Sequence, residues 1–162
     1  MKSIKSLPSL AALAFCLSAS SLASAATITP VGTAFTAPGT ISVSSPASLQ
    51  VPVNCNVTFK GTTAPDGSYA SIDSVTVSGS NPLCNVPQMT GLPWRLTVSS
   101  VTSGQVDGVG FKILTSTCGP STVYGAWSNG TNTLSGSNQP LAGNCKINSL
   151  SVNPSPAFTV NP

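Results

Sequence analysis

The side chains that most often carry catalysis are almost missing from this sequence. Its 162 residues include no histidine and no glutamate, and the only carboxylate side chains are Asp66, Asp73 and Asp107. A serine or cysteine nucleophile activated by histidine is therefore impossible. Asp66 and Asp107 each precede a glycine, which is typical of turns, and Asp73 lies in a predicted strand. We predict no catalytic residues and no enzymatic activity.

The cysteines are the other reactive side chains. Cys55, Cys84, Cys118 and Cys145 remain once a leader that carries Cys16 is set aside. Even the nearest two in sequence are 145 − 118 = 27 positions apart, whereas a Cys₄ metal site typically uses closely spaced pairs. The spacing predicts no metal site and no cofactor. Four cysteines in an exported chain instead predict two disulfides, for which three pairings exist.

An internal repeat favours one of these pairings. Each half of the chain contains, in the same order, a cysteine, a glycine twelve residues later, a Ser-Gly-Ser-Asn loop and a second cysteine. A duplicated hairpin unit would close its own disulfide, which favours Cys55–Cys84 and Cys118–Cys145. Chance similarity in a chain rich in serine, glycine and asparagine also explains the repeat. The nested pairing, Cys55–Cys145 with Cys84–Cys118, and the crossed pairing therefore stay open.

Short β-strands must position these cysteines. Val51, Val53, Cys55, Val57 and Phe59 alternate with polar or turn-forming residues. A period of two is typical of a strand with one buried and one solvated face. We therefore predict a strand that starts at Val51 and is joined to a neighbour by its cysteine.

Further strands follow along the chain. Tyr69–Val77 and the segment from Trp94 to Val98 show β-prone alternation, and Asn129–Gly130 is a strong hairpin-turn signal. Pro38–Gly39 is expected to interrupt the β-prone segment near the N-terminus. Eight to eleven short strands without a convincing helix predict an all-β fold, an antiparallel β-sandwich or barrel-like domain braced by two disulfides.

The first 25 residues have the pattern of a signal peptide. A basic start at Met1–Lys5 precedes an apolar core at Leu10–Leu17 and a small-residue cleavage site at Ala23–Ala25. We predict a signal peptide over 1–25 and a single secreted β domain over 26–162. No later segment has the roughly 20 apolar residues of a transmembrane helix, so we expect a secreted, extracellular protein.

The low charge of the chain limits the kinds of partner that it can bind. Charged residues form 6% of the chain, against roughly 25% in ordinary domains. After the predicted leader, four cationic residues oppose three aspartates, a net charge of 4 − 3 = +1. Without a basic cluster, nucleic acid is not an expected partner, and low net charge favours self-association. Tyr124 and Trp127, near the predicted hairpin turn, are candidate surface-contact residues, with core packing as the alternative.

Four stretches of the sequence resemble one protein family. They are Met1–Ser3, Val53–Thr63, Gln88–Trp94 and Ala142–Leu150, and they are similar to the alkane-oxidation activator proteins of the PraA/PraB type, small exported proteins of Gram-negative bacteria. The resemblance implies an extracellular protein that promotes growth on long-chain alkanes without being the oxidising enzyme. It implies no catalytic or binding residues.

Two mechanisms fit these observations. The first is action at the oil–water or cell surface through emulsification, adhesion or hydrocarbon binding. A predicted mature chain of 162 − 25 = 137 residues needs its apolar side chains for a core, and a dedicated pocket needs roughly 300 Å³. We therefore favour an adsorbing surface over a pocket. The alternative is a surface-fibre or biofilm-matrix adhesin subunit that assembles through edge strands.

Overall fold

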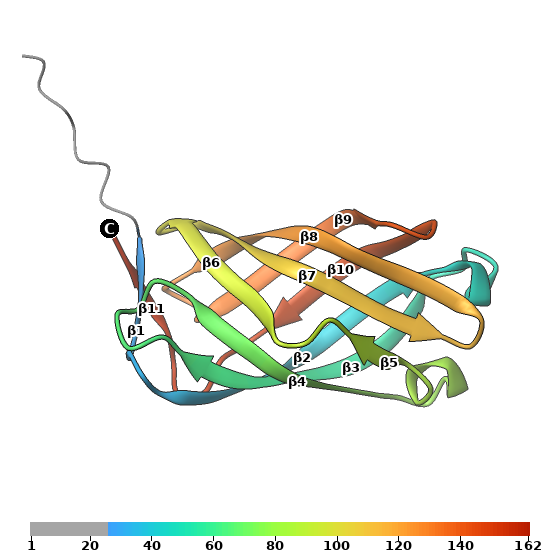
Figure 1. Ribbon diagram of the computed structural model, residues 1–162, viewed down its shortest axis with the longest axis horizontal. Coiled ribbons are helices and arrows are strands. Elements are labelled where there is room, and N and C mark those ends of the chain that lie inside the picture. Colours follow the sequence, from blue (N-terminus) through green and yellow to red (C-terminus); the bar gives the residue numbers. More distant parts are fainter. Residues whose placement is uncertain (1–25) are drawn as a thin grey trace, which may run out of the picture.

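A computed structural model describes residues 26–162, and the predicted signal peptide lies outside the described residues. The chain folds into β-strands joined by turns, with two single-turn 3₁₀ helices, η1 and η2 (Figure 1). The elements are β1 (Thr27–Thr29), β2 (Ala34–Ser44), η1 (Pro46–Ser48), β3 (Val53–Thr63), β4 (Ala70–Ser78), η2 (Pro82–Cys84), β5 (Gln88–Thr90), β6 (Trp94–Ser100), β7 (Ser103–Ile113), β8 (Ser116–Ser128), β9 (Thr133–Leu141), β10 (Cys145–Val152) and β11 (Thr159–Asn161).

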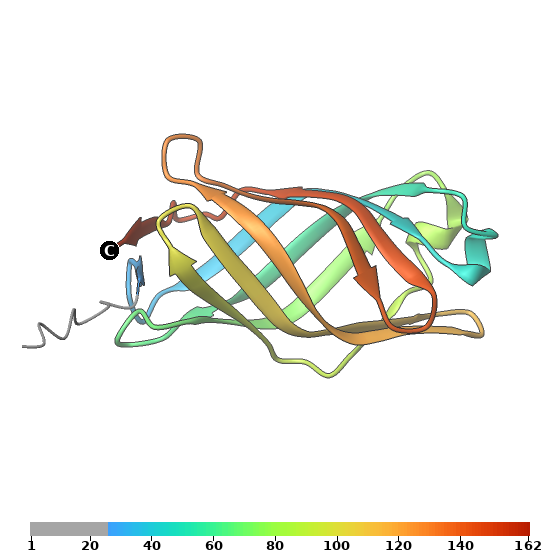
Figure 2. The same cartoon turned by 90° about the horizontal axis from the view of Figure 1, so that it is seen from above.

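Eight of these strands form a closed antiparallel barrel. The order around the sheet is β7-β6-β4-β3-β2-β10-β9-β8, and a further pairing of β7 with β8 joins the two ends (Figure 2). The short strand β5 pairs with the part of β7 that β6 does not reach. The all-β prediction is confirmed, and of its two architectures the barrel is the one found.

One end of the barrel is closed by side chains. The paired strands β1 and β11 lie at this end, on the left in Figure 1. Ile28 is buried there, and Phe158 packs edge-on against Phe35 with ring centroids 5.0 Å apart. The ring of Trp127 is 6.3 Å from that of Phe158. These large side chains fill the interior near β1 and β11.

Asn129, in the loop between β8 and β9, holds the C-terminal strand onto this closed end. Its side-chain oxygen accepts hydrogen bonds from the backbone N–H of Val160 at 2.8 Å and from the indole N–H of Trp127 at 2.6 Å. Its side-chain amide donates to the carbonyl of Val160 at 2.9 Å. The residue predicted to form a hairpin turn therefore also satisfies the backbone of β11.

Two details of the predicted strands are wrong. Val51 precedes β3 and is exposed, because Pro52 has no N–H for the ladder and pairing begins at Val53. Pro38 does not break β2, which runs through it and pairs it with Thr58. The missing N–H of Pro38 faces the β10 side beyond the last ladder pair, and there the carbonyl of Pro38 still accepts a hydrogen bond from the N–H of Asn153 at 3.0 Å.

Replacement of Asn129 by alanine is expected to lower the free energy of unfolding by about 2–4 kcal/mol, because it leaves partly buried polar groups of Val160 and Trp127 without partners. Urea unfolding measures this change. Asn54→Ala, at an exposed position on β3, is the matched control and should change stability by no more than about 0.5 kcal/mol. Equal effects of the two substitutions would contradict the role given to Asn129.

Candidate functional site

The opposite end of the barrel, which we call the mouth, contains an apolar cavity. Its volume is about 80 Å³, counted as the space that the centre of a water-sized sphere can reach. A site for one water needs roughly 10–15 Å³ in such a measure, so the cavity has room for about five to eight groups the size of a methylene. The side chains around it include Ile41, Val43, Val53, Val57, Val75, Val77, Met89, Trp94, Val109 and Ile113.

The cavity wall carries no charge and few polar atoms. Ser45 and Ser48 supply its only hydroxyl groups, and the Ser48 side chain is already bonded to the backbone of Ser45 at 3.0 and 3.1 Å. The indole N–H of Trp94 donates to the carbonyl of Thr90 at 2.9 Å, so this donor is already used within the protein. Such a wall can bind an apolar molecule by removing it from water, and the hydroxyl of Ser45 is the one side-chain hydroxyl of the lining that is not already used by the η1 turn.

Two short turns at the mouth are set by the local sequence. Proline occupies the first position of both 3₁₀ helices, where its missing N–H is not needed. Before η2, the side chain of Asn81 accepts a hydrogen bond from the N–H of Leu83 at 2.9 Å and caps the turn. The turn places Leu83 at the cavity and Cys84 beside β3.

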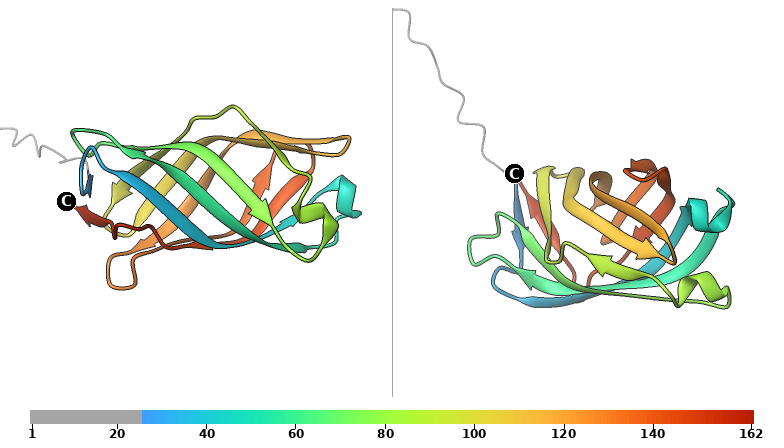
Figure 3. Two further views of the ribbon diagram at one scale, coloured as in Figure 1. Left: turned by 90° about the horizontal axis from the view of Figure 1, so that it is seen from below. Right: turned by 45° about the vertical axis from the view of Figure 1, so that its right-hand side comes forward.

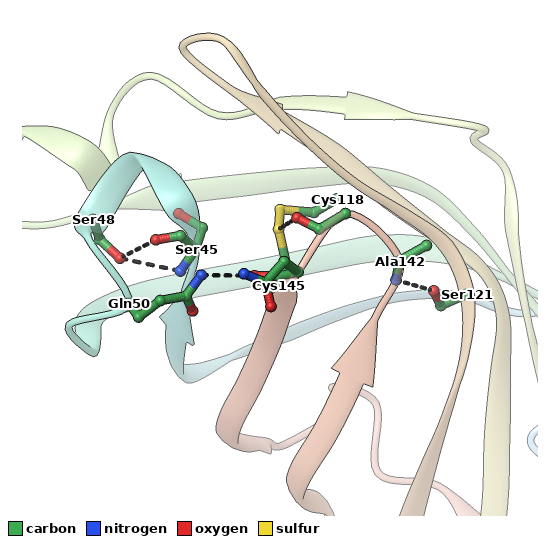
Figure 4. The surroundings of a disulfide bond; sticks show 9 residues. Ser45, Ser48, Gln50, Cys118, Ser121, Ala142 and Cys145 are labelled. Atoms are coloured by element: carbon green, nitrogen blue, oxygen red, sulfur yellow. Dashed lines mark hydrogen bonds between the residues drawn. A yellow bond between two sulfur atoms is a disulfide. The ribbon is translucent and has the colours of Figure 1, made fainter.

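Both disulfides lie at the mouth. Cys55–Cys84 fastens η2 to β3, and Cys118–Cys145 fastens the beginning of β8 to the beginning of β10 (Figure 4). This is the pairing that the repeat favours, and the nested and crossed pairings are not found. Each bridge therefore ties a loop or strand end of the mouth to the wall of the barrel.

Hydrogen bonds connect the mouth loops to one another. The side-chain amide of Gln50, which follows η1, donates to the carbonyl of Asn144 at 2.9 Å, in the turn between β9 and β10 (Figure 4). The N–H of Ala142 in the same turn donates to the hydroxyl of Ser121 on β8 at 3.0 Å. The loops around the cavity are therefore held in place without any ligand.

The barrel wall is incomplete on one side of the cavity. The pairing of β4 with β6 covers only Ala70–Ile72, and β5 pairs with β7 alone. Between the remainder of β4 and β5, the chain passes through η2, and Leu83, Pro87 and Met89 line the cavity there. This part of the wall is made of loop, attached to β3 by Cys84.

Of the four cysteines and the two candidate surface-contact residues, only Cys55 lines the cavity. Tyr124 is 60% exposed on β8, and its role in surface contact stays a prediction. Trp127 is 6% exposed and packs on Phe158, so it belongs to the core, the alternative that the sequence left open. Asp66 accepts hydrogen bonds from the backbone and side chain of Ser68, which lower the pKa of its carboxyl group.

Sequence reasoning missed the cavity itself. Its lining is made of inward-facing strand residues such as Val57 and Val77, whose alternation is the same whether opposite side chains touch or leave a space. Within residues 26–162, no group of three or more histidine, cysteine, aspartate or glutamate side chains could hold a metal ion. In the same part of the chain, no helix is long and apolar enough to cross a membrane.

Fold and site together define a closed antiparallel β-barrel that encloses an apolar cavity at one end. The family model described as alkane oxidation protein activator PraA/PraB-like matches residues 1–162, so the chain belongs to this family. The resemblance seen in the sequence is thereby confirmed. No curated protein and no solved structure gives a significant match to the chain.

Removal of either disulfide by paired Cys→Ser substitutions is expected to lower the free energy of unfolding by about 3–4 kcal/mol, because the bridges close loops of similar length, 29 and 27 residues. Chemical unfolding of the two double variants measures both losses. The variant without Cys55–Cys84 should also change its affinity for apolar dyes, because this is the one of the two disulfides that attaches η2 to the wall of the cavity. A loss below about 1 kcal/mol for either pair would contradict the bracing role.

Proposed function

We propose that this protein is an extracellular, non-enzymatic hydrocarbon-binding protein that promotes the use of long-chain alkanes by taking alkyl chains into the barrel. The observation that carries the proposal is the uncharged, apolar cavity at the mouth, in a member of a family named for the activation of alkane oxidation. The cavity is smaller than the roughly 300 Å³ of a dedicated ligand pocket, so we propose that the barrel takes in a segment of an alkyl chain rather than a whole long-chain alkane. The name activator and the absence of histidine support a role other than catalysis.

The energetics suit an alkyl chain. Each methylene group removed from water contributes about 0.8 kcal/mol, so five to eight groups contribute roughly 4–6 kcal/mol before the cost of ordering the ligand. The bridged mouth loops are already in place, which limits the further cost of ordering the protein. Without a polar partner in the wall, affinity should depend on chain length rather than on a head group.

A series of n-alkanols from butanol to dodecanol tests this dependence, because these alcohols dissolve better than alkanes. Displacement of the uncharged dye 1-N-phenylnaphthylamine measures their binding. We expect each added methylene to tighten binding by up to about fourfold, with a plateau once the cavity is full. Dye displacement that does not change with chain length, or no displacement at all, would contradict alkyl-chain binding in a cavity.

Val77→Phe tests the location of the site. Val77 is a half-buried residue of β4 that lines the cavity, so a phenyl ring at this position should occupy the space that the ligand needs. We expect at least about tenfold weaker alkanol binding with an unchanged or higher melting temperature, because the ring fills a void. Val98→Phe, at a half-buried position of β6 outside the cavity lining, is the control and should bind as the wild type does.

The surface-fibre alternative requires free strand edges. Three stretches lack a ladder partner on one side: β4 after Ile72, the three-residue strand β5, and the seam between β8 and β9, which pair only at Ala126–Ser128. The first two are short, and the third is bridged within the barrel by hydrogen bonds from the N–H of Tyr124 to Gln139 and from the N–H of Gly119 to Ala142. They therefore offer little backbone for strand addition. Filaments of the purified protein in negative-stain micrographs would favour this alternative over a soluble binding protein.

A further inference from the structure

Four exposed aliphatic side chains surround the cavity, and we call them the mouth rim. They come from the loop after η1, the loop after η2 and the turn between β7 and β8, all at the end that comes forward in the right-hand view of Figure 3. Each lies within two residues of a side chain that lines the cavity. The mouth rim consists of Leu49, Val51, Val86 and Leu114, which are 87%, 60%, 40% and 65% exposed.

The backbone at two rim positions is unfavourable for the residue present. Leu49 and Leu114 have φ angles of 52° and 53°, in the left-handed region that glycine and asparagine tolerate best. Of the other non-glycine residues with positive φ, three are asparagines, and Gln50 uses its side chain for the hydrogen bond to the mouth turn at Asn144; the asparagines are Asn132, Asn138 and Asn144. An exposed leucine at such a position gains no packing and keeps the strain. Fold stability therefore does not explain these two leucines, and strain of this kind points to a function.

The chemistry of the rim selects its partner. Protein surfaces that bind bilayers use tryptophan and tyrosine at the head-group level and clusters of lysine or arginine for anionic lipids. The rim is aliphatic only, and the mouth segments 45–52, 79–87, 114–115 and 142–144 contain no charged or aromatic residue. Lys112 and Lys146 are exposed on the neighbouring strands β7 and β10 and stay in water. Liquid hydrocarbon has a surface without head groups, so it matches this rim better than a membrane does.

The geometry points to the mouth rim as a docking surface for the hydrocarbon–water interface, with the mouth facing the oil. Docking in this orientation joins the cavity directly to the hydrocarbon phase, so an alkyl chain enters the barrel without crossing water. The inference rests on the proposed function for its purpose, since a rim around a cavity that binds no alkyl chain would deliver nothing. The docking itself depends on the rim alone.

The double variant Leu49→Asn/Leu114→Asn tests the rim. Tension at a hexadecane–water drop is recorded against protein concentration. The concentration for the half-maximal early decrease should rise by about tenfold or more for each leucine lost. The melting temperature should stay equal or rise, because asparagine suits positive φ.

The control is the double variant Val31→Asn/Val101→Asn, which removes two exposed aliphatic residues elsewhere, in the loop after β1 and the turn after β6. It should adsorb as the wild type does. Equal adsorption by all three proteins would overturn the proposal.

Two further measurements separate the docking from the pocket. The rim variant should keep wild-type alkanol binding in solution, whereas Val77→Phe should keep adsorption at the drop. If the rim variant adsorbs as the wild type does while Val77→Phe loses alkanol binding, docking is overturned and the proposed function stands. Wild-type binding to phosphatidylglycerol vesicles together with no adsorption to hexadecane would overturn docking in favour of a membrane surface.

Discussion

The hydrogen-bonded pairing of β7 with β8 is the interaction on which the rest of the structure depends, because it closes the sheet. In a closed barrel the strand number sets the interior width, so the inward side chains decide whether that interior is solid or hollow. Near β1 and β11 the aromatic rings of Phe35, Trp127 and Phe158 fill it. At the mouth, inward-facing valines such as Val53 and Val77 line a cavity. One architecture thus provides a packed core at one end and a binding space at the other.

This division explains where the covalent bonds lie. Side chains that line a cavity lack packing partners on one side, so the mouth contributes less to stability than the filled end. Both disulfides brace the mouth, where packing is weakest, and the closed end is held instead by aromatic packing and by the hydrogen bonds of Asn129. The hydrogen bond from Gln50 to Asn144 adds a further connection between mouth loops. The walls of the cavity are thus held by the covalent and hydrogen bonds of the mouth itself.

The sequence predicts local features of this structure well and long-range ones poorly. Alternation located β3 and placed Val57 and Phe59 on its buried face, and the internal repeat favoured the disulfide pairing that is found. A period of two states which side chains share a face, but not whether that face meets a second sheet or its own sheet closed into a barrel. The choice between sandwich and barrel therefore stayed open. The cavity was not predicted for the same reason: the spacing of residues along one strand does not depend on the distance across the barrel.

The proposed function needs no proton transfer, so a chain without histidine or glutamate can carry it out. Moving an alkane out of its own liquid needs no such transfer, because its obstacle is the contact of methylene groups with water. In the proposed function, a cavity without charge lowers that obstacle for a bound chain, and in the proposed docking an aliphatic rim removes the water layer between oil and protein. The strained conformations of Leu49 and Leu114 are understandable in these terms, since their side chains have no partner in the fold and a fitting one in hydrocarbon. The composition of the mouth segments, which contain no charged residue, follows the same logic, because each charged group there would have to lose its hydration on contact with oil.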